Sequence, residues 1–396
     1  MENIPKSCNF AEIYPVRELI KNIMINRILG NNIQNVLYKN KAIILLGARQ
    51  TGKTTLLKQL FGQEKNILWL NGDDSDVHNL FINATSTSLK AAIGNYTTVI
   101  IDEAQRIENI GLKLKLITDQ VPNIQLVATG SSAFELSNKI NEPLTGRKWE
   151  FQLFPLSFAE MVEQHGLLEE KRLLRHRLLY GYYPEIVVNQ GNERQFLKQL
   201  SDSYLYKDIL QWEGIQKPEK LLILLKALAF QIGNMVSYNE LAQSCGLDSK
   251  TVEKYILLLE KTFVIFRLGS FARNLRNELK FSRKIYFYDN GIRNSLISNF
   301  NQIEMRDDRG ALWENFLVSE RIKKLHYDAS WANSYFWRTK NQQEIDYIEE
   351  KDGNISAFEF KWNFKKQPKI NVSFKEVYNT ENMQIISSDN IEDFLL

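Results

Sequence analysis

The chain has 396 residues, of which 44% are hydrophobic and 24% are charged, an ordinary composition for a globular protein. Its 50 Lys and Arg against 47 Asp and Glu give a net charge of +3, which excludes a uniformly basic nucleic-acid coat and an acidic tail. Two cysteines, Cys8 and Cys245, cannot build a disulfide framework or a Cys-based zinc site, and the four histidines show no metal-ligand spacing. Neither a secretory signal nor a membrane-spanning run is evident, so we expect a cytoplasmic protein without a membrane partner.

The first third of the chain alternates short apolar runs with helical patterns. The apolar runs lie at residues 41–46, 66–70, 98–101 and 125–128. Strands that are apolar throughout are buried on both faces, which is typical of a parallel sheet covered by helices. We therefore predict an α/β domain with a parallel sheet over residues 1–158.

Helical patterns predominate beyond this domain. We expect a helical connector over residues 159–217, a winged-helix-like segment over 218–270, and an α+β domain over 271–396. In the second segment, Ser237 can cap a first helix, Gly246 can end it, and Asp248 or Ser249 can cap a second helix. This order is typical of a helix-turn-helix.

A helix-turn-helix suggests DNA as a partner, but the charge pattern leaves this open. The lysines of its second helix are balanced by glutamates. A denser positive run follows, and it could follow a phosphate backbone: Arg273, Arg276, Lys280, Arg283 and Lys284. The alternative is a protein-packing winged helix with a solvated charged face.

Residues 47–54 match the phosphate-binding loop pattern G-x-x-x-x-G-K-[ST], between a predicted strand and a helical run. Backbone N–H groups of such a loop wrap phosphate oxygens at a helix N-terminus. Lys53 would reach the β- and γ-phosphates, and the Thr54 hydroxyl would ligate Mg²⁺. We predict nucleotide contacts from Gly47, Ala48, Arg49, Gln50, Thr51, Gly52, Lys53, Thr54 and Thr55.

Further candidates lie at the ends of the neighbouring strands. Asp102 can hold Mg²⁺ through water, and Glu103 can act as a general base on the attacking water, although a solvated acidic turn is the alternative. Thr129 could sense the γ-phosphate or orient water, or simply cap a turn. Arg147 could stabilise the transferring phosphoryl group, in its own subunit or in a neighbour, although a surface arginine is the alternative.

The last third contains two alternating segments around an Asp-Gly turn at residues 352–353, which predicts a β-hairpin. Its register would set Asp346 directly opposite Glu359, with Lys361 on the same face. Two facing carboxylates repel unless a cation lies between them, and Mg²⁺ is the natural candidate. Lys361 could then steady an attacking hydroxide. The alternative is an amphipathic hairpin with a solvated charged face.

The hairpin pattern resembles the D-x(n)-E-x-K motif of PD-(D/E)xK nucleases. That resemblance adds Glu314, near a helix start, as a further candidate catalytic carboxylate. The chain as a whole resembles a prokaryotic family of AAA-type ATPases with a C-terminal nuclease-like domain. This wider resemblance also rests on the blocks at residues 154–158, 181–185 and 287–291. It implies a P-loop NTPase core, a winged-helix middle and a restriction-endonuclease-like end.

We therefore expect a Mg²⁺-dependent protein that binds and hydrolyses ATP and couples nucleotide state to a C-terminal half that could bind DNA. Two alternatives stay open. One is an ATP-regulated, Mg²⁺-dependent nuclease, and the other is an ATP-gated module that binds DNA or protein with little turnover. A protein partner and a second copy of the chain also stay open.

Overall fold

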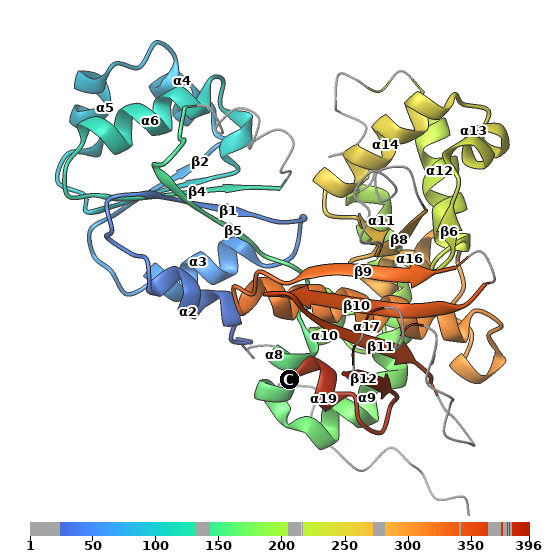
Figure 1. The fold of residues 1–396 in the computed structure, drawn as a ribbon. Helices are drawn as coiled ribbons and strands as arrows, with labels where there is room; N and C mark the ends of the chain where they lie inside the picture. The colour runs from blue at the N-terminus through green and yellow to red at the C-terminus, as the bar shows by residue number, and fades with distance from the viewer. Residues whose placement is uncertain are drawn as a thin grey trace, which may run out of the picture.

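The computed structural model describes residues 24–131, 143–204, 215, 217–271, 282–339, 342–362, 374, 378, 380 and 382–396. Two sheets organise this part of the chain, and they lie side by side in Figure 1 with helices around each. No helix within these residues combines the length and the apolar character that crossing a bilayer requires.

The first sheet has five parallel strands in the order β2-β3-β4-β1-β5. Every residue of β1, β3 and β4 is buried, as predicted for apolar strands covered on both faces, whereas β2 at the edge of the sheet is only half-buried. This confirms the α/β fold with a parallel sheet. The strands are β1 (Ala42–Leu46), β2 (Ile67–Asn71), β3 (Thr98–Asp102), β4 (Gln125–Gly130) and β5 (Lys148–Gln152).

Helices cover both faces of the first sheet (Figure 1). Leu29 and Phe61 pack on one face, and Val77 and Leu114 pack on the other. The helices are α2 (Ile28–Gln34), α3 (Lys53–Phe61), α4 (Ser75–Phe81), α5 (Ser86–Ile93) and α6 (Ile110–Gln120), and a 3-10 turn at Ala104–Arg106 follows β3.

The second sheet has seven strands in the order β12-β11-β10-β9-β7-β8-β6. β7 pairs with β9 in parallel, so the sheet continues across the division expected at residue 270. The division of the chain at residues 158, 217 and 270 stays a prediction. The strands are β6 (Met235–Val236), β7 (Ile265–Ser270), β8 (Arg283–Phe287), β9 (Asn333–Arg338), β10 (Glu344–Lys351), β11 (Asn354–Phe360) and β12 (Met383–Ile386).

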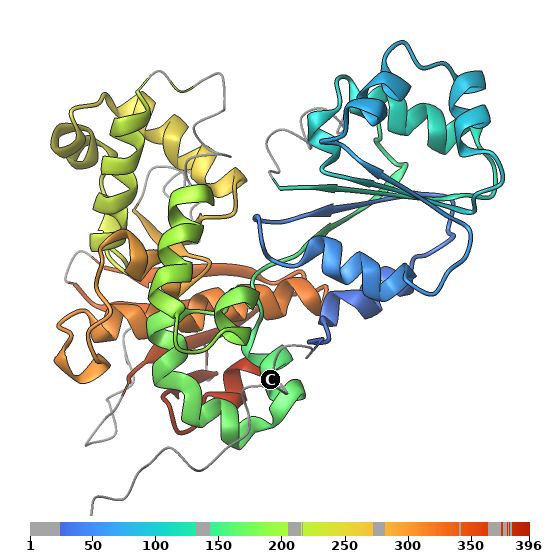
Figure 2. The same cartoon turned by 180° about the vertical axis from the view of Figure 1, so that it is seen from behind.

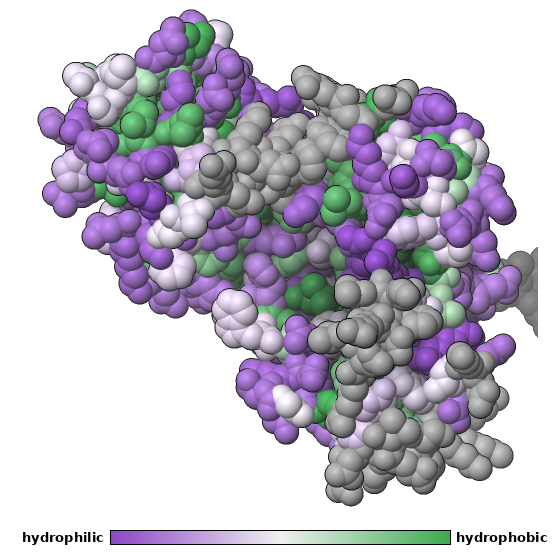
Figure 3. Space-filling view, turned by 45° about the horizontal axis from the view of Figure 1, so that its top comes forward, coloured by the Kyte–Doolittle hydropathy of each residue, from purple (hydrophilic) through white to green (hydrophobic). Residues whose placement is uncertain are grey.

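The remaining helices surround this sheet, and Figure 2 shows several of them from behind. They are α8 (Phe158–His165), α9 (Leu167–Tyr180), α10 (Pro184–Val188), α11 (Glu193–Tyr204), α12 (Pro218–Phe230), α13 (Tyr238–Cys245), α14 (Ser249–Lys261), α16 (Asn290–Leu296), α17 (Arg309–Tyr327) and α19 (Glu392–Leu395), with a 3-10 turn at Ile303–Met305. On the face drawn in Figure 3, hydrophobic residues lie in small groups between hydrophilic ones, which is ordinary for a protein surface.

Two local sequence predictions match the structure. The side chains of Ser237 and Asp248 accept backbone N–H groups at the starts of α13 and α14, and Gly246 separates the helices in a left-handed conformation with φ of 63°. The hairpin of β10 and β11 has the predicted register, which pairs Tyr347 with Phe358.

Candidate functional site

The phosphate-binding loop lies between the end of β1 and the start of α3. Gly47 admits no side chain, because a Cβ there would lie 2.2 Å from the backbone oxygen of Leu153. Gly52 starts the helix in the left-handed region with φ of 95°. The loop therefore has the strand-loop-helix setting that directs backbone N–H groups toward a bound phosphate.

Lys53 is buried, and its ammonium group lies over the loop. Its Nζ donates to the backbone oxygens of Gly47 at 2.8 Å and Ala48 at 2.9 Å. Thr51 steadies the same turn by donating its hydroxyl to Ala48 at 2.8 Å. The ammonium group is thus held at the loop whose backbone N–H groups would bind a β- or γ-phosphate.

The other predicted nucleotide contacts differ in exposure. Gln50 adopts the left-handed conformation with φ of 58°. Its side chain and that of Thr55 are exposed, and Arg49 is half-buried. A contact from any of these three side chains to nucleotide stays a prediction.

The two strand tips beside the loop bring four polar residues together. Thr54 donates its hydroxyl to Asp102 Oδ2 at 2.8 Å, and Thr129 donates to the other carboxylate oxygen. The backbone N–H of Glu103 donates to the Thr129 hydroxyl at 3.0 Å. Thr129 therefore fixes both Asp102 and Glu103, because parallel strands end at the same edge of the sheet.

Thr54 and Asp102 fit a magnesium ion. Mg²⁺ in nucleotide sites takes one or two protein oxygens together with phosphates and waters. A hydroxyl and a carboxylate that already lie within hydrogen-bonding distance supply two such oxygens at the end of the phosphate loop.

Gln105 belongs to this site, although its place in the sequence did not indicate a role. Its amide donates to Glu103 Oε2 at 2.6 Å and to Ser131 Oγ at 3.1 Å. It therefore orients the candidate general base. A signal was present in the sequence, because Gln105 follows the acidic pair by two residues, but its direction depends on the 3-10 turn after β3.

The structure corrects one prediction for Arg147. The residue precedes β5 at the edge of the sheet opposite the phosphate loop, since its backbone oxygen accepts from Ala42 at the start of β1. Its side chain donates to Asp119 at 2.7 Å. Arg147 therefore cannot reach the phosphates bound by its own subunit, and only the role in a neighbouring subunit stays a prediction.

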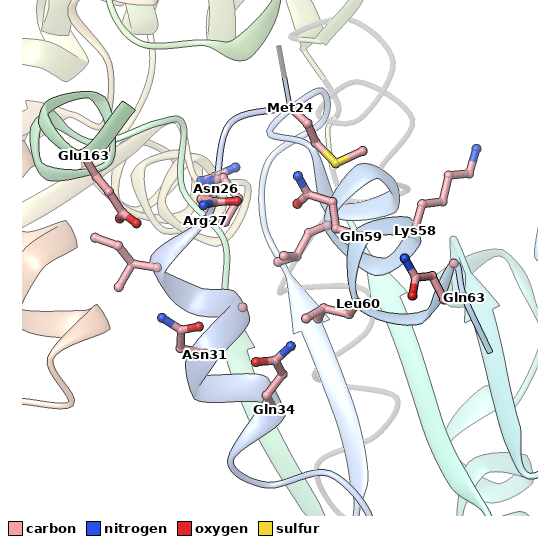
Figure 4. A pocket seen from close by; sticks show the side chains of 14 residues that line it. Met24, Asn26, Arg27, Asn31, Gln34, Lys58, Gln59, Leu60, Gln63 and Glu163 are labelled. Atoms are coloured by element: carbon pink, nitrogen blue, oxygen red, sulfur yellow. The ribbon is translucent and has the colours of Figure 1, made fainter. Parts of the chain in front are cut away.

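A hollow of about 590 Å³ runs along the phosphate-loop helix. Figure 4 shows α2 and α3 side by side, with polar side chains on both. The chain before α2 and helix α2 contribute Asn26, Arg27, Asn31 and Gln34, while α3 and its end contribute Gln59 and Gln63. Arg27 is the member of this lining that reaches the phosphate loop, where it donates to the backbone oxygen of Thr51.

A second cluster of charged groups lies where α17 meets the hairpin of β10 and β11. Lys361 Nζ lies 3.3 Å from Glu359 Oε2 and 3.9 Å from Asp346 Oδ2, so the predicted face does assemble. Asp346 also accepts the backbone N–H of Phe360 at 2.7 Å. Burial raises the pKa of Asp346 and that of Glu359, and the Asp346 charge raises the pKa of Glu359 further.

Glu314 joins this cluster from α17 through partners that the sequence did not reveal. Lys284 Nζ lies 2.8 Å from Glu314 and 2.5 Å from Glu344, and the Tyr286 hydroxyl donates to Glu314 at 2.6 Å. Burial raises the pKa of Glu314 to about 7, with Lys284 opposing the rise and Asp346 adding to it. Lys284 and Tyr286 lie on β8, whose alignment with α17 is a tertiary feature.

The hairpin cluster fits a magnesium ion less well than the phosphate loop does. Lys361 already lies between Asp346 and Glu359, and Lys284 already bridges Glu314 and Glu344. Within the described residues, no group of three or more His, Cys, Asp or Glu has the arrangement of a metal site. Lys361 therefore offsets part of the negative charge of the two hairpin carboxylates.

The positive run expected after β7 is only partly within the described residues, since Arg273, Arg276 and Lys280 lie outside them. Lys284 is buried with 1% of its side chain exposed, so the prediction that it contacts phosphates is wrong. Arg283 is accessible, and it donates to the Tyr238 hydroxyl at 3.0 Å.

Family models of protein domains match three stretches of the chain. Residues 39–162 match the family model described as an AAA domain. Residues 171–303 and 309–394 each match a domain of unknown function.

Several relatives match most of the chain at low identity. An uncharacterised protein of Methanocaldococcus jannaschii is 22% identical over 81% of this chain and 75% of its own length. An uncharacterised protein of Mycobacterium tuberculosis is 25% identical over 91% of this chain and 79% of its own. Among solved structures, the Walker-type ATPase of Pyrococcus abyssi covers 70% of this chain and 97% of its own at 14% identity, with a TM-score of 0.49.

The AAA match and the site geometry concern the same part of the chain. Residues 39–162 contain the parallel sheet, the phosphate loop and the acidic strand tip. This part of the chain is therefore similar to AAA domains and carries a phosphate-binding loop.

Proposed function

We propose that this protein binds ATP with Mg²⁺, hydrolyses it, and couples the nucleotide state to its C-terminal half. The observation that carries the proposal is the 2.8 Å hydrogen bond from Thr54 to Asp102. It joins the two oxygens that a nucleotide-bound Mg²⁺ requires, directly after Lys53 and directly before Glu103. ATP is preferred to GTP because the family resemblance implies it and no guanine-reading N-K-x-D motif is evident in the sequence.

Each residue of the site would have a separate task. When nucleotide binds, the Lys53 ammonium group would leave the backbone oxygens of the loop and contact the β- and γ-phosphates. The N–H groups of the loop would bind the same phosphates. Mg²⁺, held by Thr54 and through water by Asp102, would neutralise phosphate charge. Glu103 would accept the proton of the attacking water, with Gln105 and Thr129 holding it in place.

Nucleotide binding is tested with Lys53→Ala and the control Lys90→Ala, an exposed lysine on α5 of the same domain. Loss of a charge-assisted contact to phosphate weakens binding by roughly ten- to a hundredfold. Calorimetry with Mg²⁺ and either ATP or GTP measures this. If the wild-type protein takes up no nucleoside triphosphate at millimolar concentration, the proposal fails.

Hydrolysis is tested with Glu103→Gln. We expect nucleotide binding to persist and turnover to fall by about a hundredfold or more, because the amide cannot accept the proton of water. Glu108→Gln, an exposed change on the same loop, serves as the control. Unchanged phosphate release in Glu103→Gln would reject the assigned base. Nucleotide-dependent association with DNA or protein without any turnover would favour the ATP-gated binding module.

A nuclease is the second candidate function, and the meeting of Glu314, Asp346, Glu359 and Lys361 at one place favours it. The purified protein should then cleave DNA or RNA with Mg²⁺ or Mn²⁺. Cleavage should vanish in Asp346→Ala and in Lys361→Ala while ATP hydrolysis survives. Intact substrate under every combination of metal and ATP would reject this candidate.

A further inference from the structure

Arg27 is a buried residue that joins four segments far apart in the sequence. Its guanidinium donates to the backbone oxygens of Thr51 and Phe154 at 2.7 Å each, and to Glu160 Oε1 at 3.0 Å. The hydroxyl oxygen of Tyr327 lies 3.5 Å from Nη2. Only 5% of the Arg27 side chain is exposed, so these groups replace water as its partners.

The contact with Thr51 controls a peptide group of the phosphate loop. The carbonyl of Thr51 and the N–H of Gly52 belong to one planar trans peptide, so they point in opposite directions. By holding the carbonyl, Arg27 fixes the direction of that N–H. A charged donor that binds the carbonyl also makes the N–H of the same peptide a stronger donor. In the other direction, an anion that binds the N–H makes the carbonyl a stronger acceptor. The Arg27 contact is thus sensitive to the charge that the loop holds.

The opposite side of Arg27 meets the end of α17. The Tyr327 hydroxyl also accepts the backbone N–H of Phe154 at 3.2 Å, and the backbone oxygen of Tyr327 accepts the side-chain amide of Asn32 at 2.6 Å. Figures 1 and 2 both show the end of α17 beside α2. The last residue of this helix is therefore anchored to the phosphate-loop domain through three hydrogen-bonding groups.

Helix α17 extends from these contacts to the second charged cluster. It has 19 residues and is therefore about 28 Å long. Buried Glu320 accepts the backbone N–H of Phe158 at 2.7 Å, and buried Lys323 donates to the backbone oxygen of Leu156 at 3.0 Å. Near its other end the helix holds Glu314, beside the hairpin of β10 and β11.

We propose that Arg27 is a positioning residue that links occupancy of the phosphate loop to helix α17, with Tyr327 as the connection to the C-terminal half. This inference rests on the proposed nucleotide binding. A bound phosphate tightens the Thr51–Arg27 contact, and the altered position of Arg27 changes its contact with Tyr327. Because coupling between two binding events is reciprocal, a partner that binds the C-terminal half through α17 alters nucleotide affinity by the factor by which nucleotide alters the affinity for that partner.

The variant Tyr327→Phe removes the hydroxyl that contacts Arg27 and keeps the ring. Tyr347→Phe is the matched control, since it removes a buried hydroxyl that contacts Ser334 at 2.7 Å, away from Arg27. Hydrogen–deuterium exchange of the full chain is measured with and without a non-hydrolysable ATP analogue and Mg²⁺. We expect the analogue to slow exchange at residues 320–327 by about threefold or more in the wild type and in Tyr347→Phe, but not in Tyr327→Phe.

The outcomes separate this inference from the proposed function. If calorimetry detects binding of the analogue but exchange in α17 stays unchanged in the wild type, the inference is overturned and nucleotide binding stands. The inference is likewise overturned if Tyr327→Phe keeps the full wild-type response. If the wild type binds no analogue, the proposed function itself fails.

Arg27→Lys tests the positioning role at the loop. Lysine keeps the charge but cannot make the several contacts of the planar guanidinium. We expect KM for ATP to rise about tenfold while kcat at saturating ATP changes less than threefold, because Arg27 orients a binding N–H rather than the attacking water. A fall in kcat with unchanged KM would contradict the assignment. Thermal unfolding of the variant separates this split from a general loss of fold.

Discussion

At the scale of single residues, the acidic strand tip depends on one hydroxyl. Glu103 adopts the left-handed backbone conformation with φ of 51°, which costs an ordinary residue about 1–2 kcal/mol. The Glu103 N–H is held in that conformation by Thr129, whose hydroxyl donates in turn to Asp102. Thr129 therefore connects the candidate metal ligand to the candidate base, and this supports a role beyond the capping of a turn.

Thr129→Val should separate these roles. Valine fills the same space but can neither accept from Glu103 nor donate to Asp102. We expect kcat for ATP hydrolysis to fall about tenfold, since a lost hydrogen bond is worth roughly 1–2 kcal/mol in the placement of the base. Steady-state kinetics measure the effect, and Thr129→Ser should restore most of the rate. A valine variant with the wild-type kcat would show that Thr129 only caps a turn.

Glu314 should make the stability of the protein depend on pH. Its pKa is about 7 in the folded chain against an ordinary 4.5, so the folded state binds this proton more tightly. The resulting stabilisation is present below about pH 4.5 and is lost as the pH rises through 7, by up to about 3 kcal/mol. Glu314→Gln cannot ionise. We therefore expect urea unfolding of this variant to depend less on pH between 5 and 8 than the wild type does.

The matching control for that experiment is Glu219→Gln, an exposed glutamate on α12. It should keep the wild-type pH profile. Equal slopes for Glu314→Gln and the wild type would show that Glu314 does not hold its proton in the folded protein.

At the scale of elements, the contact between α9 and α16 gives a structural role to two of the sequence blocks on which the family resemblance rests. Asp289 accepts the backbone N–H of Tyr182 at 2.6 Å and that of Ile292 at 3.1 Å, so it caps α16 and holds the end of α9 at once. A Cβ on Gly181 would lie 2.1 Å from the Asp289 carboxylate. The blocks at residues 181–185 and 287–291 thus meet each other in the fold, and their role here is structural.

Gly291→Ala should disrupt this contact. The added Cβ would lie 2.1 Å from the backbone oxygen of Tyr180, which cannot move without displacing α9. We expect a loss of about 3 kcal/mol in the free energy of unfolding, measured with urea. Gly310→Ala in α17 is the control, because open space surrounds that position and alanine favours a helix. Equal stability of the two variants would contradict this account.

At the scale of the whole molecule, the second sheet joins two segments that the sequence separates. Gly269 and Ser270 of β7 pair in parallel with Tyr335 and Phe336 of β9, in the interior of the sheet. Unfolding of either segment would leave the other with an unpaired strand edge that exposes backbone N–H and C=O groups. We infer that residues 218–396 behave as one cooperative unit.

That inference predicts a single unfolding free energy for β7 and β10. Hydrogen exchange under increasing urea should give peptides from both strands the same value. When ATP is added, the unfolding free energy of peptides from β3 should change differently from that of β7 and β10. ATP at a hundred times its Kd should stabilise the first domain by about 2.7 kcal/mol if the nucleotide proposal holds. Separate free energies for β7 and β10 would contradict the single unit.

The sequence by itself determined the features that depend on neighbouring residues. The phosphate loop is eight consecutive residues, and its glycines set the turn in any context. The hairpin register follows from Asp352 and Gly353, which adopt φ of 51° and 80° in the turn. Apolar runs predicted the buried strands of the first sheet for the same reason, because burial on both faces leaves a continuous apolar pattern.

Only the tertiary structure decided which distant groups meet. Lys284 resembles any other surface cation in the sequence, but β8 places it between Glu314 and Glu344. Arg147 follows the loop motif in the chain, but it precedes β5, which runs parallel to β1, and therefore lies at the start of these strands while the loop lies at their end. Arg27 reaches a residue 300 positions away. Side-chain hydrogen bonds act over about 3 Å in space, and no pattern in one segment encodes which other segment will lie within that range.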